Sequence, residues 1–217
     1  MEKIKETIKT KYKWIIFAIV LIIFLAIAED VFEKEIFEFD GVIYNFLVSH
    51  RNSVLNTFFK GVTHLGSGIV LVPLTILCMI FIKNKKYKIM MPINVFLVVG
   101  INWLLKNLFV RPRPNELRLI EETGYSFPSG HAMASTAVYG LLIYIAYKEI
   151  KNKKIRNAIC ILLAILISLI DISRIYVGVH YTSDVLGGTC LSIAYLIVFT
   201  QIAKIIDSKK DKRKEAA

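Results

Sequence analysis

Six long apolar segments constrain the fold of this 217-residue chain more than any other feature of its sequence. A transmembrane helix needs about 20 mainly apolar residues, and each segment is of roughly that length and holds few charges. They are residues 14–28, 65–82, 89–110, 131–147, 157–172 and 183–206. We therefore predict an all-α fold, an integral membrane bundle of six transmembrane helices.

The segments follow one another without an internal repeat, a low-complexity stretch or a Gly/Ser-rich linker. This favours a single membrane-embedded domain over residues 1–217, with short charged tails at about 1–13 and 207–217. The first segment also fits a signal peptide, because a basic start and an apolar run precede Ala26-Ile27-Ala28. Cleavage there is the alternative to a retained span, and both leave the later motifs on the same side of the membrane.

Positive charge gathers in four segments that alternate with pairs of spans. The N-terminus before Trp14 carries five Lys, residues 83–88 carry four, residues 148–156 carry five Lys or Arg, and the C-terminus from Lys204 carries six. Cytoplasmic loops show this excess, so we predict a multi-pass protein with both termini in the cytoplasm. The net charge of +11 then requires no nucleic-acid partner. The Lys- and Ile-rich composition with short loops favours a bacterial plasma membrane.

A first polar motif lies at the end of the third span, where Lys106 is followed after six residues by Arg113-Pro114. Pro112 and Pro114 end the helix and favour extended backbone before them, so Arg111 and Arg113 enter the outer loop. A lysine from the helix and an arginine fork could bind phosphate from two sides. Anchoring of the span at the membrane surface is the alternative use of these cations.

A second motif, Pro128-Ser129-Gly130-His131, begins the fourth span. A serine at the start of a helix is a natural N-cap. The free N–H groups there attract anions, and Gly130 lets the backbone approach closely. His131 would lie within reach of a bound phosphate. A plain cap with a histidine at the membrane surface is the alternative interpretation.

A third motif is Ser173-Arg174, followed by His180 and by Asp184 at the start of the last span. Residues four apart share one face of a helix. Asp184 can then accept a hydrogen bond from one ring nitrogen of His180 and leave the other nitrogen as a nucleophile. A metal site or a plain surface pair would use the same two residues.

Metal binding is the less favoured of these interpretations. No further His or Cys stands at the usual ligand spacing from His180. Cys78, Cys160 and Cys190 all lie in apolar segments, and an odd number of such thiols predicts neither a disulfide framework nor a metal cluster. We expect no metal and no cofactor.

The three motifs, in this order and at these spacings, resemble the type 2 phosphatidic acid phosphatase family of membrane lipid phosphatases. The resemblance rests on Lys106 with Arg113-Pro114, on residues 128–131, and on Ser173-Arg174 with His180 and Asp184. The six-residue spacing selects Arg113 over Arg111, which stands in a second Arg-Pro pair and could assist.

The resemblance implies a metal-independent, two-step hydrolysis of a phosphomonoester or diphosphate lipid at the outer membrane–water interface. His180 would attack phosphorus and form a phosphohistidine, Asp184 would orient His180, and His131 would protonate the leaving oxygen and then activate water. The residues expected to hold the phosphoryl oxygens are Lys106, Arg113, Arg174 and the backbone of Ser129 and Gly130. Phosphatidylglycerophosphate, phosphatidic acid and undecaprenyl diphosphate are the expected substrate candidates.

Two other classes of membrane protein are weaker alternatives. A non-catalytic protein that binds anionic lipid would need the cations, but not a histidine paired with a carboxylate. A transporter would place ionisable groups in the middle of its spans, where this sequence has few. Between the first two spans, residues 40–66 carry apolar side chains at helical spacing and could form interfacial helices or ordinary packing.

Overall fold

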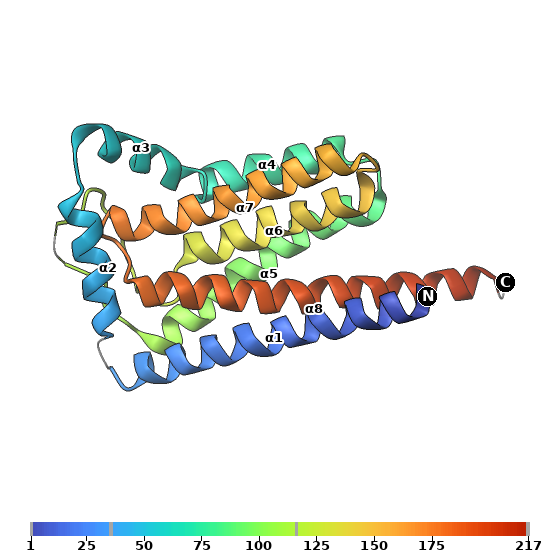
Figure 1. Ribbon diagram of the computed structural model, residues 1–217, viewed down its shortest axis with the longest axis horizontal. Helices are drawn as coiled ribbons and strands as arrows, with labels where there is room; N and C mark the ends of the chain where they lie inside the picture. The colour runs from blue at the N-terminus through green and yellow to red at the C-terminus, as the bar shows by residue number, and fades with distance from the viewer. Residues whose placement is uncertain (1, 35–36, 116, 216–217) are drawn as a thin grey trace.

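The computed structural model describes residues 2–34, 37–115 and 117–215, and within them the regular structure is α-helical (Figure 1). The helices are α1 (Glu2–Phe32), α2 (Glu38–Ser49), α3 (Ser53–His64), α4 (Gly68–Phe81), α5 (Lys85–Phe109), α6 (Gly130–Glu149), α7 (Lys153–Tyr176) and α8 (Thr182–Glu215). This confirms the all-α prediction. Both predicted tails continue a helix where they are described, and Met1, Ala216 and Ala217 lie outside the described residues.

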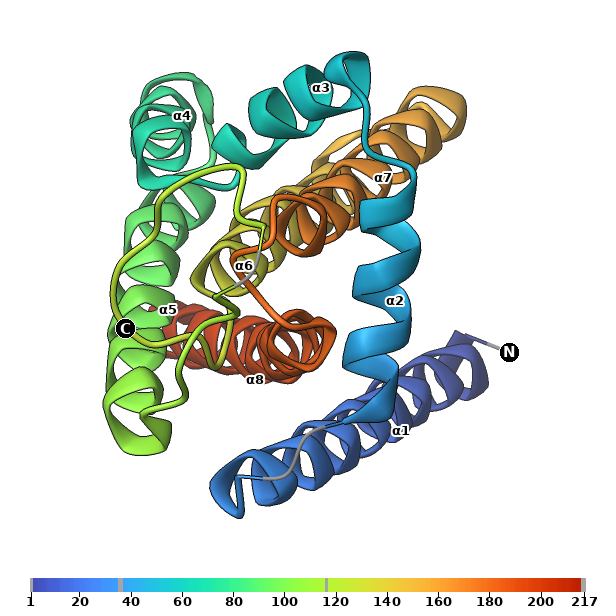
Figure 2. The ribbon, with the colours of Figure 1, turned by 90° about the vertical axis from the view of Figure 1, so that its left-hand side faces the viewer.

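Helix α6 forms the centre of the bundle and packs against α5, α7 and α8 (Figure 2). Small side chains allow this close packing, because its buried face includes Ala132, Ser135 and Ala137. A side chain at Gly140 would come within 2.6 Å of Leu196 Cδ1 on α8. Helix α1 packs along α8, and α4 packs along α5.

The number of spans differs from the six predicted. Four described helices are long and apolar enough to cross a membrane, namely α1, α5, α7 and α8, and α3 with α4 makes a fifth if this pair, bent by 47°, is counted as one span. With 14 residues, α4 is only about 21 Å long, less than the bilayer core. Helix α6 is enclosed by neighbours, so small residues replace the apolar surface that lipid contact would require.

The ends of the bundle differ in what they carry. The connections α4–α5 and α6–α7 lie at the same end as the two termini, whereas α2 and α3 lie at the opposite end (Figure 1). Helix α3 and most of α2 fall within residues 40–66, the region for which interfacial helices and ordinary packing were the two alternatives. At this opposite end Phe24 of α1 stacks on Phe127, which precedes α6, with ring centroids 6.1 Å apart. The core thereby ties α1 to the segment that leads into the second motif.

Candidate active site

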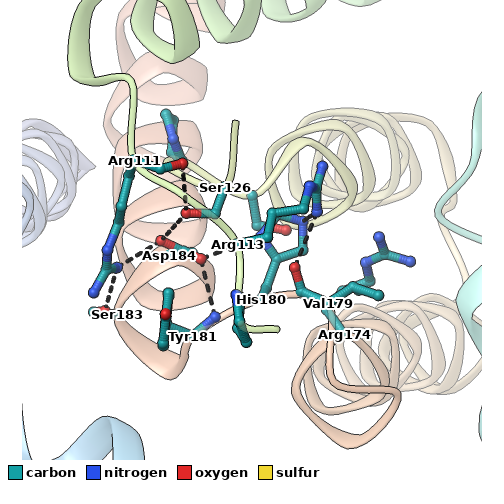
Figure 3. A network of polar contacts seen from close by, with 12 residues as sticks. Arg111, Arg113, Ser126, Arg174, Val179, His180, Tyr181, Ser183 and Asp184 are labelled. Carbon is teal, nitrogen blue, oxygen red and sulfur yellow. Dashed lines mark hydrogen bonds and ion pairs between the residues drawn. The ribbon is translucent and has the colours of Figure 1, made fainter. Parts of the chain in front are cut away.

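The three sequence motifs meet at the end of the bundle that α2 crosses (Figure 2), and Figure 3 shows residues of the first and third motifs there. Helix ends position four of the predicted residues: Lys106 in α5, His131 in α6, Arg174 in α7 and Asp184 in α8. Arg113 and His180 belong to the connections that follow α5 and α7. Residues that are up to 78 positions apart in the chain therefore surround one small volume.

His180 is held through both of its ring nitrogens. Its Nδ1 lies 3.3 Å from Asp184 Oδ2, and its Nε2 lies 3.0 Å from Arg113 Nη1. A guanidinium only donates hydrogen bonds, so Nε2 accepts from Arg113 and carries a lone pair. The proton is then on Nδ1 and is donated to Asp184. The sequence predicts this contact between His180 and Asp184 from two helical residues on one face; the structure makes the contact, but with His180 just before α8 and Asp184 in its first turn.

The surroundings of His180 favour its neutral form. The side chain is buried, and this burial is the largest cause that lowers the pKa of His180 well below its ordinary value. Positive charge on Arg174, Arg113 and Lys106 lowers the pKa further. The imidazole therefore keeps a lone pair on Nε2 at neutral pH.

Arg174 is completely buried beside this histidine and is neutralised by a carboxylate. Its Nη1 donates to Thr63 Oγ1 at 2.7 Å, and its Nη2 donates to Glu122 Oε1 at 2.6 Å. The second oxygen of Glu122 lies 3.9 Å from Arg113 Nη2. Burial alone would raise the pKa of Glu122, but the Arg174 guanidinium holds it below its ordinary value. One carboxylate thus lies between two arginines.

The start of α6 shows which backbone amide is free to bind an anion. Ser129 caps the helix, since its Oγ accepts from Ala132 N at 3.4 Å, and its own N–H donates to Asp184 O at 3.0 Å. The N–H of Gly130 is among the first amides of the helix, which have no partner within it. A side chain at Gly130 would approach Asn102 Oδ1 to 3.1 Å. Of the two predicted backbone donors, Gly130 is therefore the one available.

Lys106 and His131 lie on either side of this helix start. The Nζ of Lys106 donates to Tyr125 O, and its Cε lies 3.9 Å from the position that a side chain at Gly130 would take. His131 lines a cavity of about 220 Å³ together with Gly66 and Gly130. A second cavity of about 400 Å³ is lined by His180 and Arg113. The cavities flank the predicted nucleophile and the predicted acid.

Arg111 has a larger part in this site than its place in the sequence indicates. Its Nη1 lies 2.6 Å from Asp184 Oδ1, and its Nη2 lies 3.2 Å from Asp40 Oδ2. Asp40 of α2 also accepts from the N–H of Ser183 at 2.7 Å and from its Oγ at 2.6 Å. The oxygen of Asp184 that does not face His180 is therefore paired with Arg111 (Figure 3). Through Asp40, these contacts tie α2 to α8.

Three of these residues, Asp40, Thr63 and Glu122, were assigned no role in the site from the sequence. Thr63 and Glu122 contact Arg174, and Asp40 contacts Arg111 and Ser183, in each case from a distant part of the chain. The repeated Arg-Pro pair was the one signal in the sequence for Arg111. Among the described residues, no group of three or more His, Cys, Asp or Glu side chains is placed to hold a metal ion.

Comparison with known proteins identifies the class to which this fold and site belong. Residues 87–206 match the model of the PAP2 superfamily. The chain is 33% identical over 197 residues to phosphatidylglycerophosphatase B of Bacillus subtilis (strain 168), covering 86% of this chain and 92% of that protein. It is 30% identical over 196 residues to an undecaprenyl-diphosphatase of Sulfolobus acidocaldarius, covering 86% of this chain and 90% of that protein.

Two solved structures share the architecture. The crystal structure of a transmembrane PAP2-type phosphatidylglycerolphosphate phosphatase from Bacillus subtilis superposes with a TM-score of 0.76 at 29% identity, covering 89% of this chain and 96% of that one. Aquifex aeolicus LpxE superposes with a TM-score of 0.65 at 28% identity, covering 76% and 96%. The protein is a multi-pass membrane phosphatase that hydrolyses phosphoric esters. It belongs to the PAP2 superfamily, as the resemblance of its motifs indicated.

Proposed function

We propose that this protein hydrolyses the terminal phosphate of a membrane lipid at the outer face of the plasma membrane through a phosphohistidine on His180. The observation that supports this best is the contact geometry of His180, whose Nδ1 faces Asp184 and whose Nε2 lone pair faces the phosphate-binding arginine Arg113. A lipid binder has no need of an oriented imidazole. The candidate substrates are phosphatidylglycerophosphate, phosphatidic acid and undecaprenyl diphosphate, and the names of the relatives agree with the first and the third of them.

The proposed orientation follows from the charge distribution. The basic segments lie at the end of the bundle that holds both termini, and the site lies at the opposite end (Figure 1). The positive-inside rule then places both termini in the cytoplasm and the site outside. A lipid head group of the outer leaflet would reach the site at the level of the helix ends.

In the first step, Nε2 of His180 attacks phosphorus and the bond from phosphorus to the leaving oxygen breaks. The electron pair of that bond goes to the leaving oxygen, which takes a proton from His131. Asp184 stabilises the positive charge that develops on the imidazole. In the second step, His131 removes a proton from water, whose oxygen attacks phosphorus. The phosphorus–nitrogen bond breaks, inorganic phosphate leaves, and neutral His180 is restored.

Cations and a free amide supply the stabilisation of the transferred group. Phosphoryl transfer spreads negative charge over the equatorial oxygens, so fixed positive groups provide most of the rate enhancement. We assign this role to Lys106, Arg113, Arg174 and the amide of Gly130, with Ser129 as the cap that holds that amide. Glu122 lies between the two arginines, where phosphate oxygens would bind, so it has to leave both when substrate enters.

This position of Glu122 predicts that Glu122→Gln strengthens the binding of inorganic phosphate. A neutral amide competes less well for Arg174 than a carboxylate, and a charged hydrogen bond contributes about 1 kcal/mol more than a neutral one, so the inhibition constant for phosphate should fall about fivefold. Inhibition of lipid hydrolysis by added phosphate measures this. The control is Glu121→Gln, because Glu121 is the neighbouring residue in the chain and its side chain is exposed. Weaker inhibition in Glu122→Gln would show that Glu122 supports phosphate binding instead.

The neutral state of His180 predicts how the rate depends on pH. Because burial and neighbouring cations lower the pKa of His180, the nucleophile stays unprotonated as the pH falls through the ordinary histidine pKa of about 6.5. The acidic limb of kcat/KM should therefore lie below about pH 6.5. Initial rates across the acidic and neutral range, on a substrate whose own titration is recorded separately, measure it. A limb centred at or above the ordinary histidine pKa would contradict the proposed environment of His180.

Phosphate release from the three candidate lipids tests the proposed function itself. Purified protein in detergent should release phosphate from at least one of them, and the rate should persist in EDTA, because every proposed catalytic group is a side chain or an amide. Loss of activity in EDTA with recovery on adding a divalent cation would revive the metal interpretation. Release from none of the three lipids would leave a different phosphate ester as the substrate class.

A further inference from the structure

A groove on the far side of α6 from the catalytic residues has no part in the proposed reaction. It encloses about 460 Å³ between α7 and α8, with α6 beneath. Both α7 and α8 pack closely on α6 and contact each other far less, which leaves this space open between them. Its walls are mainly apolar and include Ile143, Ile167, Ile193 and Leu196. Such walls suit a lipid chain.

One part of the groove is polar and incompletely paired. The Oγ1 of Thr189 donates to Asp171 Oδ2 at 2.8 Å. The other oxygen of Asp171 is buried without a hydrogen-bond partner, as is the Oγ1 of Thr136. The Thr136 side chain is 3% exposed and lines the groove. A donor and an acceptor on two residues that line the same groove are thus both left unused.

This polar place lies inside the apolar part of the bundle. At about 1.5 Å per residue, Thr136 lies about 9 Å from the start of α6, Asp171 about 8 Å from the end of α7, and Thr189 about 10 Å from the start of α8. These depths agree and lie below the level of the catalytic side chains. An unpaired carboxyl oxygen and an unpaired hydroxyl are costly at such a depth, so a ligand that pairs them gains binding energy there.

The groove and the cavity at His131 use opposite faces of α6. The cavity of about 220 Å³ beside the predicted acid is lined by His131, Ala134 and Val138. The groove is lined by Thr136, Gly140 and Ile143. At about 100° per residue these two sets point in nearly opposite directions. A ligand in the groove therefore leaves the active site open to substrate.

We propose that this groove binds a lipid alcohol, an uncharged amphiphile with a hydroxyl head group and an apolar chain. A hydroxyl both donates and accepts, so it can donate to Asp171 Oδ1 and accept from Thr136 Oγ1. The chain lies along the apolar walls. A lipid phosphate fits less well than an alcohol, because its polar neighbours there would be a carboxyl group and a hydroxyl and not the cations that bind phosphate. The cationic residue in the lining of the groove is Lys13. It lies about 28 Å from the outer end of α1, much deeper than Asp171, which is about 8 Å from the end of α7.

Photolabelling of the full-length protein tests the proposal. The protein is placed in nanodiscs of dioleoylphosphatidylcholine with a diacylglycerol that carries a diazirine in one chain, and labelled peptides are mapped by mass spectrometry. Label is expected on the groove-lining parts of α7 and α8. Unlabelled dioleoylglycerol should compete. Hexadecanol should compete if the hydroxyl and one chain suffice, and dioleoylphosphatidic acid should not.

Four variants separate the hydroxyl contact from general lipid contact. Asp171→Leu and Thr136→Val should each reduce the labelling about fivefold, the effect of losing one buried hydrogen bond of about 1 kcal/mol. Asp171→Asn should stay within twofold, because its amide oxygen still accepts. Ser168→Ala is the matched control, since Ser168 lines the same groove but already donates to Ala164 O at 3.2 Å.

The outcomes separate the possible occupants. If Asp171→Leu fails to fold, judged by its thermal midpoint, the pair Asp171→Asn and Thr136→Val carries the same test. Labelling that is unchanged in Asp171→Leu and Thr136→Val, or that phosphatidic acid competes equally well, would overturn the proposal in favour of ordinary lipid contact. Absence of labelling above that of protein-free nanodiscs would also overturn it and leave water as the occupant.

Discussion

His180→Ala should abolish turnover while leaving the fold intact, with a loss in kcat of at least about 10³-fold, because removal of a catalytic nucleophile leaves only the rate enhancement from binding and charge stabilisation. The loss should exceed that of the other site variants. In the structure, the nitrogen nucleophile is Nε2 of His180, which carries a lone pair. The Arg113 guanidinium beside it only donates hydrogen bonds, and Asp184 presents carboxylate oxygens. Phosphate release from the preferred lipid, with protein of known thermal midpoint, measures it.

A covalent intermediate gives this prediction a second measurement. Wild-type protein quenched in base after mixing with a lipid carrying labelled phosphate should retain acid-labile, base-stable label, and His180→Ala should retain none. His131→Ala should still accumulate some label if its main role is to activate water in the second step. Turnover in His180→Ala within tenfold of the wild type would show that another residue attacks phosphorus.

The sequence was sufficient for those parts of the site that depend on local spacing. Asp184 lies in the first turn of α8 and its Oδ2 contacts both the Tyr181 N–H at 2.9 Å and His180 Nδ1 at 3.3 Å, so the contact depends on where α8 begins, although His180 itself precedes the helix. Ser129 and Gly130 are placed as a cap because an apolar helix begins there, and Lys106 lies in the last turn of α5 because two prolines follow. Each of these inferences needs only a helix boundary.

The contacts that the sequence did not reveal join distant segments. Ser183 and Asp40 are 143 residues apart, and Arg174 and Glu122 are 52 residues apart. Glu122 lies in the connection between α5 and α6, where no hydrophobic period fixes the direction of a side chain. The packing of α2 across the bundle decides where Asp40 points. The number of spans differed from the prediction for a related reason. Helix α6 is packed against α5, α7 and α8 and contains small residues at those contacts, and the sequence alone does not identify these neighbours.

Arg111→Met should destabilise the protein strongly and lower its activity as well. Arg111 lies between two buried carboxylates, with its Nη1 2.6 Å from Asp184 and its Nη2 3.2 Å from Asp40. Removing one partner from a buried ion pair costs about 3–5 kcal/mol, because the remaining charge is left without compensation. For a protein of this size that corresponds to a fall in the thermal midpoint on the order of 10 °C. Thermal unfolding in detergent, followed by intrinsic fluorescence, measures it.

The double variant Asp40→Asn with Arg111→Met distinguishes uncompensated charge from lost packing. The Asp40→Asn change removes one of the two carboxylates that Arg111 neutralises, while the new amide oxygen can still accept from Ser183. If charge causes the loss, the double variant should be more stable than Arg111→Met alone. Its activity should remain low, because Asp184 still lacks the guanidinium that fixes the carboxylate behind His180. Equal midpoints for the single and double variants would mean that Arg111 stabilises α2 against α8 by packing, with its charge contributing little.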